Sequence, residues 1–312
     1  MPLSGSSSFR SSGELETYFD QLGFKTAITQ ISNGQLVGQV SYNASSAIKF
    51  FHIESSQALL IYGDHNPNII PIAVETSANR EYTKSQGHSL PISSIAGYGI
   101  QKSEYFYSVS PGSSMYFVIL PSIAFQGLSY QLSGEQIIDK LQKTNMMRLN
   151  VDRFLHLERY CQAWTYKIKT QSNPEIFLND IMTYSHDLFG SALSDDYTAS
   201  NFCKPVVQKF IQLCLENNPN RPVQVSDMLT NLFVSKTHLN SQIKKATGLS
   251  PLKFMRCARL EQVRRELLLS EGRANIGELA RRYGFSSRGH FAQNYNELFG
   301  EKPTETLFKF LL

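Results

Sequence analysis

The sequence predicts an α+β protein, with a β-rich N-terminal part followed by an all-α C-terminal part. Three observations support this: short β-branched and aromatic runs between turn signals up to about residue 131, helical periodicity from Ser133 onward, and a short pattern that occurs twice near the C-terminus. The length of 312 residues suits two domains, and the hydrophobic fraction of 41% suits a globular protein.

The N-terminal part, about residues 15–131, reads as a barrel or sandwich of short antiparallel strands. Its runs "ALLIY", "NIIPIAVE" and "SMYFVIL" are rich in residues that favour strands, and "ISNGQ", "YGDHNPN" and "SPGSS" separate them. Frequent turns between short strands are typical of an antiparallel architecture.

The segment of about residues 133–193 is predicted to be helical. Ser133 and Gln136 resemble a capping box, and Pro174 suits the first turn of a further helix. We expect a homodimer through one apolar stripe: Phe154, Leu157, Cys161, Trp164 and Ile168. The alternative is that this stripe packs on the barrel. The polar residues 194–201 suggest a linker, which divides the chain into domains 1–200 and 201–312.

Charge is distributed unevenly along the chain. Residues 1–202 hold 13 Lys and Arg against 17 Asp and Glu, a net of −4, whereas residues 203–312 hold 17 against 9, a net of +8. Such a basic domain indicates a polyanionic partner, most often nucleic acid. The helices expected there are about 205–217, 225–232, 236–246, 251–269, 276–283 and 287–299, with a short one near Glu305.

Two stretches of this basic part follow one pattern. Val225, Met228 and Leu229 match Ile276, Leu279 and Ala280 at an offset of 51, and four later pairs match at 52: Leu239 with Phe291, Ile243 with Tyr295, Gly248 with Gly300, and Pro251 with Pro303. Each stretch therefore reads as helix, tight turn, second helix and Gly-x-x-Pro stop, at about 225–246 and 276–299. This is the helix-turn-helix plan.

The second helix of each unit should pack on one face and read DNA with the other. The residues predicted to contact DNA are Lys236, Thr237, Asn240, Ser241, Lys244, Lys245, Ser287, Arg288, Gly289, Gln293 and Asn296. We expect Lys244 and Lys245 to contact phosphates, and Arg288 to read a guanine edge or to clamp a phosphate. Gly289 would allow close approach to DNA, or simply occupy a fraying position.

This C-terminal part resembles the DNA-binding domain of the AraC/XylS family of bacterial transcription regulators. The second unit has Ile276, Leu279, Ala280, Gly284, Phe285, Phe291, Phe299, Gly300 and Pro303 where the family pattern expects them, and "GHFAQNYNELFGEKPTETL" resembles the XylS-like branch. The segment Ser250–Leu268 is similar to the family's linker helix. Gln293 and Asn296 replace frequent Arg and Lys residues, and Thr304 replaces a usual Ser, so a known operator is not transferable.

The resemblance implies a sequence-specific DNA-binding regulator. We expect an activator that reads two adjacent major grooves and responds to a ligand. Its expected partners are double-stranded promoter DNA, RNA polymerase and a small-molecule effector, in the cytoplasm at the bacterial nucleoid. The alternative is a regulator without a small-molecule site, controlled by a protein partner or by abundance. An enclosed cavity of about 300 Å³ or more in the β-rich part would favour the first.

Other classes of function lack their sequence signals. His52, His65 and His88 are isolated, and the chain contains no H-x-H, G-x-S-x-G, P-loop or G-x-G-x-x-G pattern. We therefore expect no enzyme activity, no catalytic residue, no metal and no cofactor. The four cysteines form no C-x-x-C pair and are expected to be reduced and mostly buried. No apolar run reaches the roughly 18 residues of a membrane helix, and no secretory signal is recognised.

Overall fold

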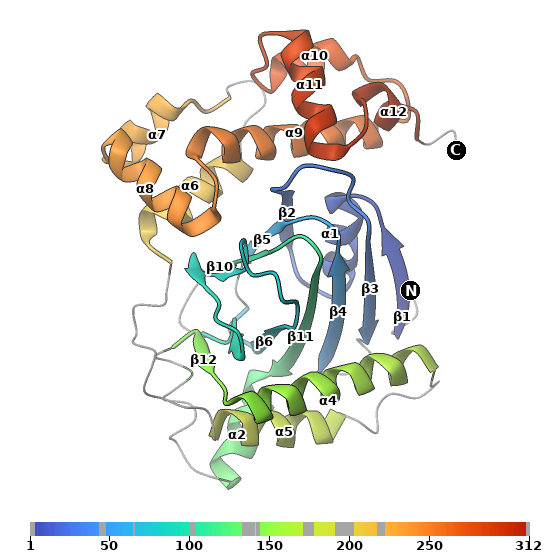
Figure 1. Ribbon diagram of the computed structural model, residues 1–312, viewed down its shortest axis with the longest axis vertical. Helices are drawn as coiled ribbons and strands as arrows, with labels where there is room; N and C mark the ends of the chain where they lie inside the picture. The colour runs from blue at the N-terminus through green and yellow to red at the C-terminus, as the bar shows by residue number, and fades with distance from the viewer. Residues whose placement is uncertain are drawn as a thin grey trace.

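The computed structural model describes residues 4–43, 48–64, 66–99, 104–132, 141, 144–170, 178–190, 203–216 and 222–309. An N-terminal domain of two antiparallel sheets carries helices at one end, and a helical C-terminal domain lies at the other (Figure 1). The predicted α+β class is confirmed.

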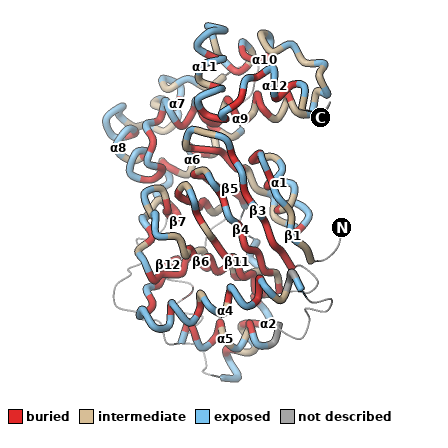
Figure 2. The backbone as a smooth tube through the Cα atoms, turned by 45° about the vertical axis from the view of Figure 1, so that its right-hand side comes forward, coloured by how far each residue is buried: buried red, intermediate tan, exposed pale blue. Residues whose placement is uncertain are grey.

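Two sheets build the N-terminal domain. The larger has, in spatial order, β1 (Ser4–Phe9), β3 (Gly38–Asn43), β4 (Lys49–Ser55), β11 (Ser113–Pro121), β6 (Ile69–Glu75), β9 (Ser94–Ala96) and β12 (Met146–Arg148). The smaller has β2 (Thr26–Gln30), β5 (Leu59–Asp64), β10 (Glu104–Val109), β7 (Lys84–Ser85) and β8 (His88–Ser89). Figure 2 shows that the strands are buried along most of their length.

The strands are buried on both faces because each sheet is covered on both sides. On β5, Leu59 and Ile61 belong to the core between the sheets, whereas Leu60 belongs to the core shared with the C-terminal domain. On β4, Phe51 belongs to the core between the sheets and Phe50 packs under the N-terminal domain's own helices. Alternate residues thus serve two cores, as the period of a strand requires.

The predicted division into a β-rich and a helical segment was wrong for three elements. Two helices, α1 (Ser12–Gln21) and α2 (Ser122–Leu132), lie inside the predicted β-rich segment, and β12 lies inside the predicted helical one. Ser11 accepts a hydrogen bond from the Glu14 amide at 3.2 Å, and Glu14 accepts one from the Arg10 amide at 2.8 Å. This capping signal starts α1, whereas β12 exists because it pairs with β9.

The apolar stripe predicted to form a dimer packs on the barrel instead. Phe154, Leu157, Cys161 and Trp164 of α4 (Val151–Thr170) are at most 6% exposed and share a core with Phe50. The sheet's outer face is itself apolar, so the nearest partner for the stripe is within the chain. The side chain of Ile168, the capping pair Ser133 and Gln136, Pro174 and the linker 194–201 lie outside the described residues. Helix α5 (Leu178–Gly190) completes this layer.

The C-terminal helices begin and end within two residues of the predicted limits. They are α6 (Pro205–Leu215), α7 (Val225–Leu232), α8 (Lys236–Thr247), α9 (Pro251–Leu269), α10 (Ile276–Arg282), α11 (Arg288–Phe299) and α12 (Pro303–Leu307). Helix α9 runs between the pair α7–α8 and the pair α10–α11 (Figure 1).

Candidate nucleic-acid interface

The two helix pairs have the same local geometry at their turns. Phe233 after α7 has φ 52° and Gly284 after α10 has φ 83°. At both turns the chain therefore reverses through a residue in the left-handed conformation. Ser235 and Ser287 then cap the second helices, their hydroxyls accepting from the backbone amides three residues on at 3.2 and 3.4 Å. Because Phe233 and Gly284 are 51 apart and the serines 52, the extra residue of the second unit lies in this turn.

The inward faces of the second helices are buried as the repeat predicts. Leu239 and Ile243 of α8 are 1% and 0% exposed, and Phe291 and Tyr295 of α11 are 2% and 0% exposed. Gly248 and Gly300 then end these helices in the left-handed conformation, which glycine adopts without strain. Helix α8 and helix α11 are therefore equivalent elements.

The outward faces of both helices are open to solvent (Figure 2). Each residue predicted to contact DNA is exposed: Lys236, Thr237, Asn240, Ser241, Lys244, Lys245, Ser287, Arg288, Gly289, Gln293 and Asn296. The fold brings the first six together on α8 and the other five at the start and along the outer side of α11. We refer to these two sets as the first and second reading faces.

Contacts inside the second reading face already hold some of its side chains. The Arg288 guanidinium lies against Gly277 of α10, where an added Cβ would come within 3.2 Å of Nε. Gln293 donates from its amide to Glu297 at 2.9 Å, and the Ser287 hydroxyl caps α11. Arg288 is thus placed by a glycine on the neighbouring helix, a relation that the sequence pattern alone does not reveal.

The linker helix α9 is fixed to the N-terminal domain by buried and partly buried polar groups. Glu261, 1% exposed, accepts from the Ser12 hydroxyl at 2.6 Å and from the Gln30 amide at 2.9 Å. Arg265 donates to Glu16 of α1 at 2.6 Å and to the Ile28 carbonyl at 2.8 Å. Burial raises the pKa of Glu16 to about 7 and outweighs the opposing effect of Arg265. None of these residues carries a recognisable sequence signal, because their partners are more than two hundred positions away.

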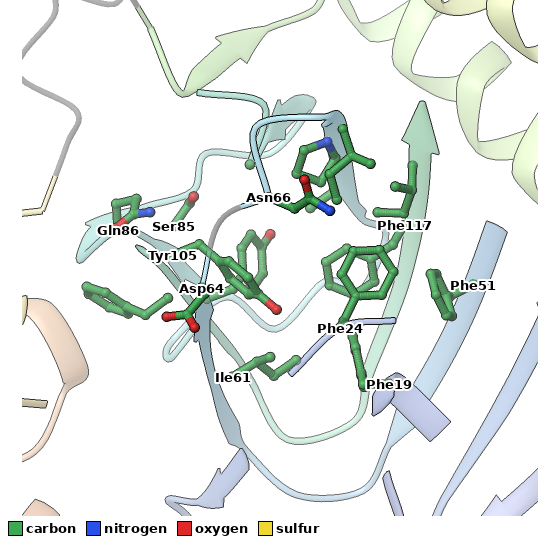
Figure 3. Close-up of a pocket in the computed structure, with 17 residues that line it drawn as sticks. Phe19, Phe24, Phe51, Ile61, Asp64, Asn66, Ser85, Gln86, Tyr105 and Phe117 are labelled. Atoms are coloured by element: carbon green, nitrogen blue, oxygen red, sulfur yellow. The ribbon is translucent and has the colours of Figure 1, made fainter. Parts of the chain in front are cut away.

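A small cavity of about 60 Å³ lies between the two sheets (Figure 3). Aromatic side chains form most of its wall: Phe19, Phe24, Phe51, Tyr105, Tyr107 and Phe117. Asp64 and Asn66 add polar groups, and the Tyr107 hydroxyl is buried with no hydrogen-bond partner among the described residues. The volume is below the roughly 300 Å³ usual for a ligand pocket, so an occupant of several atoms requires its walls to move apart.

The cysteines behave as structural residues. All four are free and buried, as predicted. Burial raises the pKa of Cys257 to about 12 and that of Cys161 and Cys214 above the ordinary value, so these thiols stay protonated. Within the described residues no three His, Cys, Asp or Glu side chains are grouped so as to hold a metal ion. The same residues include no helix long and apolar enough to span a membrane.

Paired helix-turn-helix units on one linker helix define a class of DNA-binding domain, and the comparisons agree. A helix-turn-helix domain family matches residues 228–308. The XylDLEGF operon transcriptional activator 2 of Pseudomonas putida is 32% identical over 120 residues, which cover 37% of this chain and 74% of that protein. The chain belongs to the AraC/XylS family of transcription regulators.

Two further similar proteins match a comparable share of the chain. The probable thc operon regulatory protein of Rhodococcus erythropolis is 29% identical over 121 residues, 37% of this chain but only 36% of that protein. A probable AraC family regulator from Rhodopseudomonas palustris is 29% identical, with 33% of this chain and 95% of that chain covered and a TM-score of 0.30. That superposition is too weak to transfer any property to this chain.

Proposed function

We propose that this chain is a sequence-specific DNA-binding regulator of transcription, an activator that places its two reading faces in adjacent major grooves. The observation that carries the proposal is the pair of exposed polar faces on equivalent helices α8 and α11, within a basic domain. Such helices read base edges in helix-turn-helix proteins. The linker α9 holds both units in one domain, so that they meet the same DNA duplex.

We further propose that the cavity between the sheets accepts a small-molecule effector. Its aromatic wall suits a flat apolar group, and the buried Tyr107 hydroxyl would gain a partner from a polar atom of that ligand. The small volume of the cavity implies that binding displaces a wall. RNA polymerase is the second proposed partner, a homodimer the proposed assembly, and the cytoplasmic nucleoid the proposed location.

The proposal is tested at Arg288. Duplexes that the full chain enriches from a random library supply the DNA, and Arg288→Ala is compared with the wild type on single-base variants of the enriched sequence. As a guanine reader, Arg288 contributes about 1–3 kcal/mol on that sequence and its loss relaxes preference at one base pair. Equal losses on the enriched and random duplexes would instead identify a phosphate clamp.

A second variant tests the placement of that side chain. Gly277→Ala keeps the Arg288 charge but puts a methyl group 3.2–3.3 Å from its guanidinium atoms. We expect a smaller loss than for Arg288→Ala, at the same base pair. Failure of the wild-type chain to enrich any DNA sequence would contradict the proposed function.

A further inference from the structure

The second helices of the two units, α8 and α11, both end in contact with the N-terminal domain. Near the end of α8, the Lys84 ammonium of β7 donates to the Lys245 carbonyl. Near the end of α11, the Leu298 carbonyl accepts from the Gln30 side chain at 2.6 Å and from the Gly34 amide at 3.1 Å. Ala246, the residue after Lys245, packs against Gly87 of the turn after β7 and lies 52 positions before Leu298, so the two helices are held at nearly equivalent positions of the repeat. The N-terminal domain therefore contacts both units without covering either reading face.

The end of α8 is contacted by the tight turn between β7 and β8, which packs closely against it. Gln86 and Gly87 connect β7 to β8 with φ 52° and 80°. A Cβ on Gly87 would lie 3.0 Å from the Ala246 methyl carbon and 3.1 Å from the Phe106 ring. A methyl group at Gly87 would therefore require its neighbours to give way by a few tenths of an ångström, and a displacement of the turn toward α8 would press on the end of that helix.

The other side of the same turn borders the cavity between the sheets. Ser85, Gln86 and Phe106 are among the cavity's lining residues, and Figure 3 shows Ser85 and Gln86 together at one side of it. The Phe106 ring belongs to the core that the two domains share. The turn thus lies between the cavity on one side and Ala246 on the other.

The residues that contact the end of α11 do not border the cavity. Gln30, Gly34 and Gln35, which hold the end of α11, are absent from the residues that line the cavity. A change in cavity volume would therefore act directly on the residues that hold the first unit and not on those that hold the second. The distance between the two reading faces would change in consequence.

We infer that the β7–β8 turn transmits occupancy of the cavity to the first helix-turn-helix unit, so that an effector alters DNA binding through the position of α8 alone. This inference rests on the proposed function. It names one contact, Gly87 against Ala246, as the point where the two domains are coupled. Coupling between sites is typically about 5–150-fold in affinity.

The test adds a methyl group at this contact and compares it with a matched glycine. Gly87→Ala and Gly112→Ala share a left-handed φ, but an added Cβ at Gly112 meets nothing within 4 Å. We expect Gly87→Ala to weaken binding to the enriched duplex by about fivefold or more, and Gly112→Ala to leave it unchanged. Adding Ala246→Gly to Gly87→Ala should recover part of the affinity, because it removes the opposing methyl group while the contact with the Phe106 ring stays.

Footprinting locates the effect. Arg288→Ala marks the half of the duplex bound by the second unit, and Gly87→Ala should lose protection in the other half. Equal affinities for Gly87→Ala and Gly112→Ala, or no recovery in the double variant, would overturn the inference. Failure of the wild-type chain to select DNA contradicts the proposed function instead, so the two failures are distinguishable.

A second pair of variants covers the case in which Gly87→Ala does not fold. Lys84→Met removes the ammonium group that donates to the Lys245 carbonyl, whereas Lys49→Met removes one that donates to the Leu22 carbonyl within the N-terminal domain. We expect weaker DNA binding for Lys84→Met only. Equal affinities for these two variants count against the inference.

Discussion

Gly289 is a helical glycine that packing does not require. A Cβ at this position would meet only the Ser287 hydroxyl, at 4.0 Å, and the residue lies at the exposed start of α11. Gly248 and Gly300 differ, because each ends a helix with a positive φ. Two reasons for glycine at 289 therefore remain: close approach to DNA, and a fraying position at the start of the helix where glycine costs little.

Gly289→Ala should separate stability from binding. Alanine in a helix is more stable than glycine by about 0.5–1 kcal/mol, so the free energy of unfolding in urea should rise while affinity for the enriched duplex falls. Gly127→Ala in α2 is the matched control, since it too lies inside a helix and its Cβ meets nothing within 4 Å. That variant should gain stability and keep its affinity. Unchanged affinity for Gly289→Ala would leave the fraying interpretation.

At the scale of elements, the contact between α1 and α9 carries a buried carboxylate. Glu16 accepts from the Ile28 amide and from Arg265, with Glu261 nearby on α9. Its pKa of about 7 exceeds the ordinary value of 4.5 because burial dominates. The folded chain thus holds this proton more tightly than the unfolded chain does, and the associated stability is lost as pH rises from 4.5 to 7.

Glu16→Gln should remove this part of the pH dependence. Urea unfolding at about pH 5 and pH 7 would show a smaller fall in the free energy of unfolding for the variant than for the wild type, because glutamine does not ionise. Glu14→Gln is a control on the same helix, where the carboxylate accepts from the Arg10 amide at the helix start. An identical pH dependence for Glu16→Gln and the wild type would show that Arg265 compensates for the burial.

At the scale of the whole molecule, the helices opposite the DNA-binding domain keep several exposed apolar side chains among polar ones. With the stripe of Phe154 and Trp164 buried, exposed apolar residues remain on α2 and α4: Ile123, Tyr130, Leu132, Val151, Leu155 and Tyr166, from 42% to 78% exposed. A proposed homodimer would use this surface, which lies far from both reading faces (Figure 1).

Sedimentation of the full chain at micromolar concentration tests this assembly. We expect a dimer for the wild type and a shift to monomer for Tyr166→Glu, because a charge in an apolar interface must be desolvated. Ala163→Glu, at an exposed position of the same helix outside the set of apolar residues, should remain a dimer. A monomeric wild type would contradict the proposal.

Local sequence determined the helical domain almost completely. Capping serines, glycine stops and the repeat of apolar positions each act within a few residues, so the limits of α7, α8, α9, α10 and α11 follow from neighbouring side chains. The exposure of both reading faces follows from the same period. Even the missed helix α1 had its signal in Ser11 and Glu14.

Tertiary structure decided the features that depend on distant partners. The stripe on α4 would be apolar whether it formed a dimer or packed on the barrel. Only the apolar outer face of the larger sheet shows that it packs within the chain. Glu261 meets Gln30, Arg265 meets Glu16, and Gly87 meets Ala246 across the two domains. These contacts join residues far apart in the chain, where periodicity and composition carry no information, because they depend on how the finished elements pack.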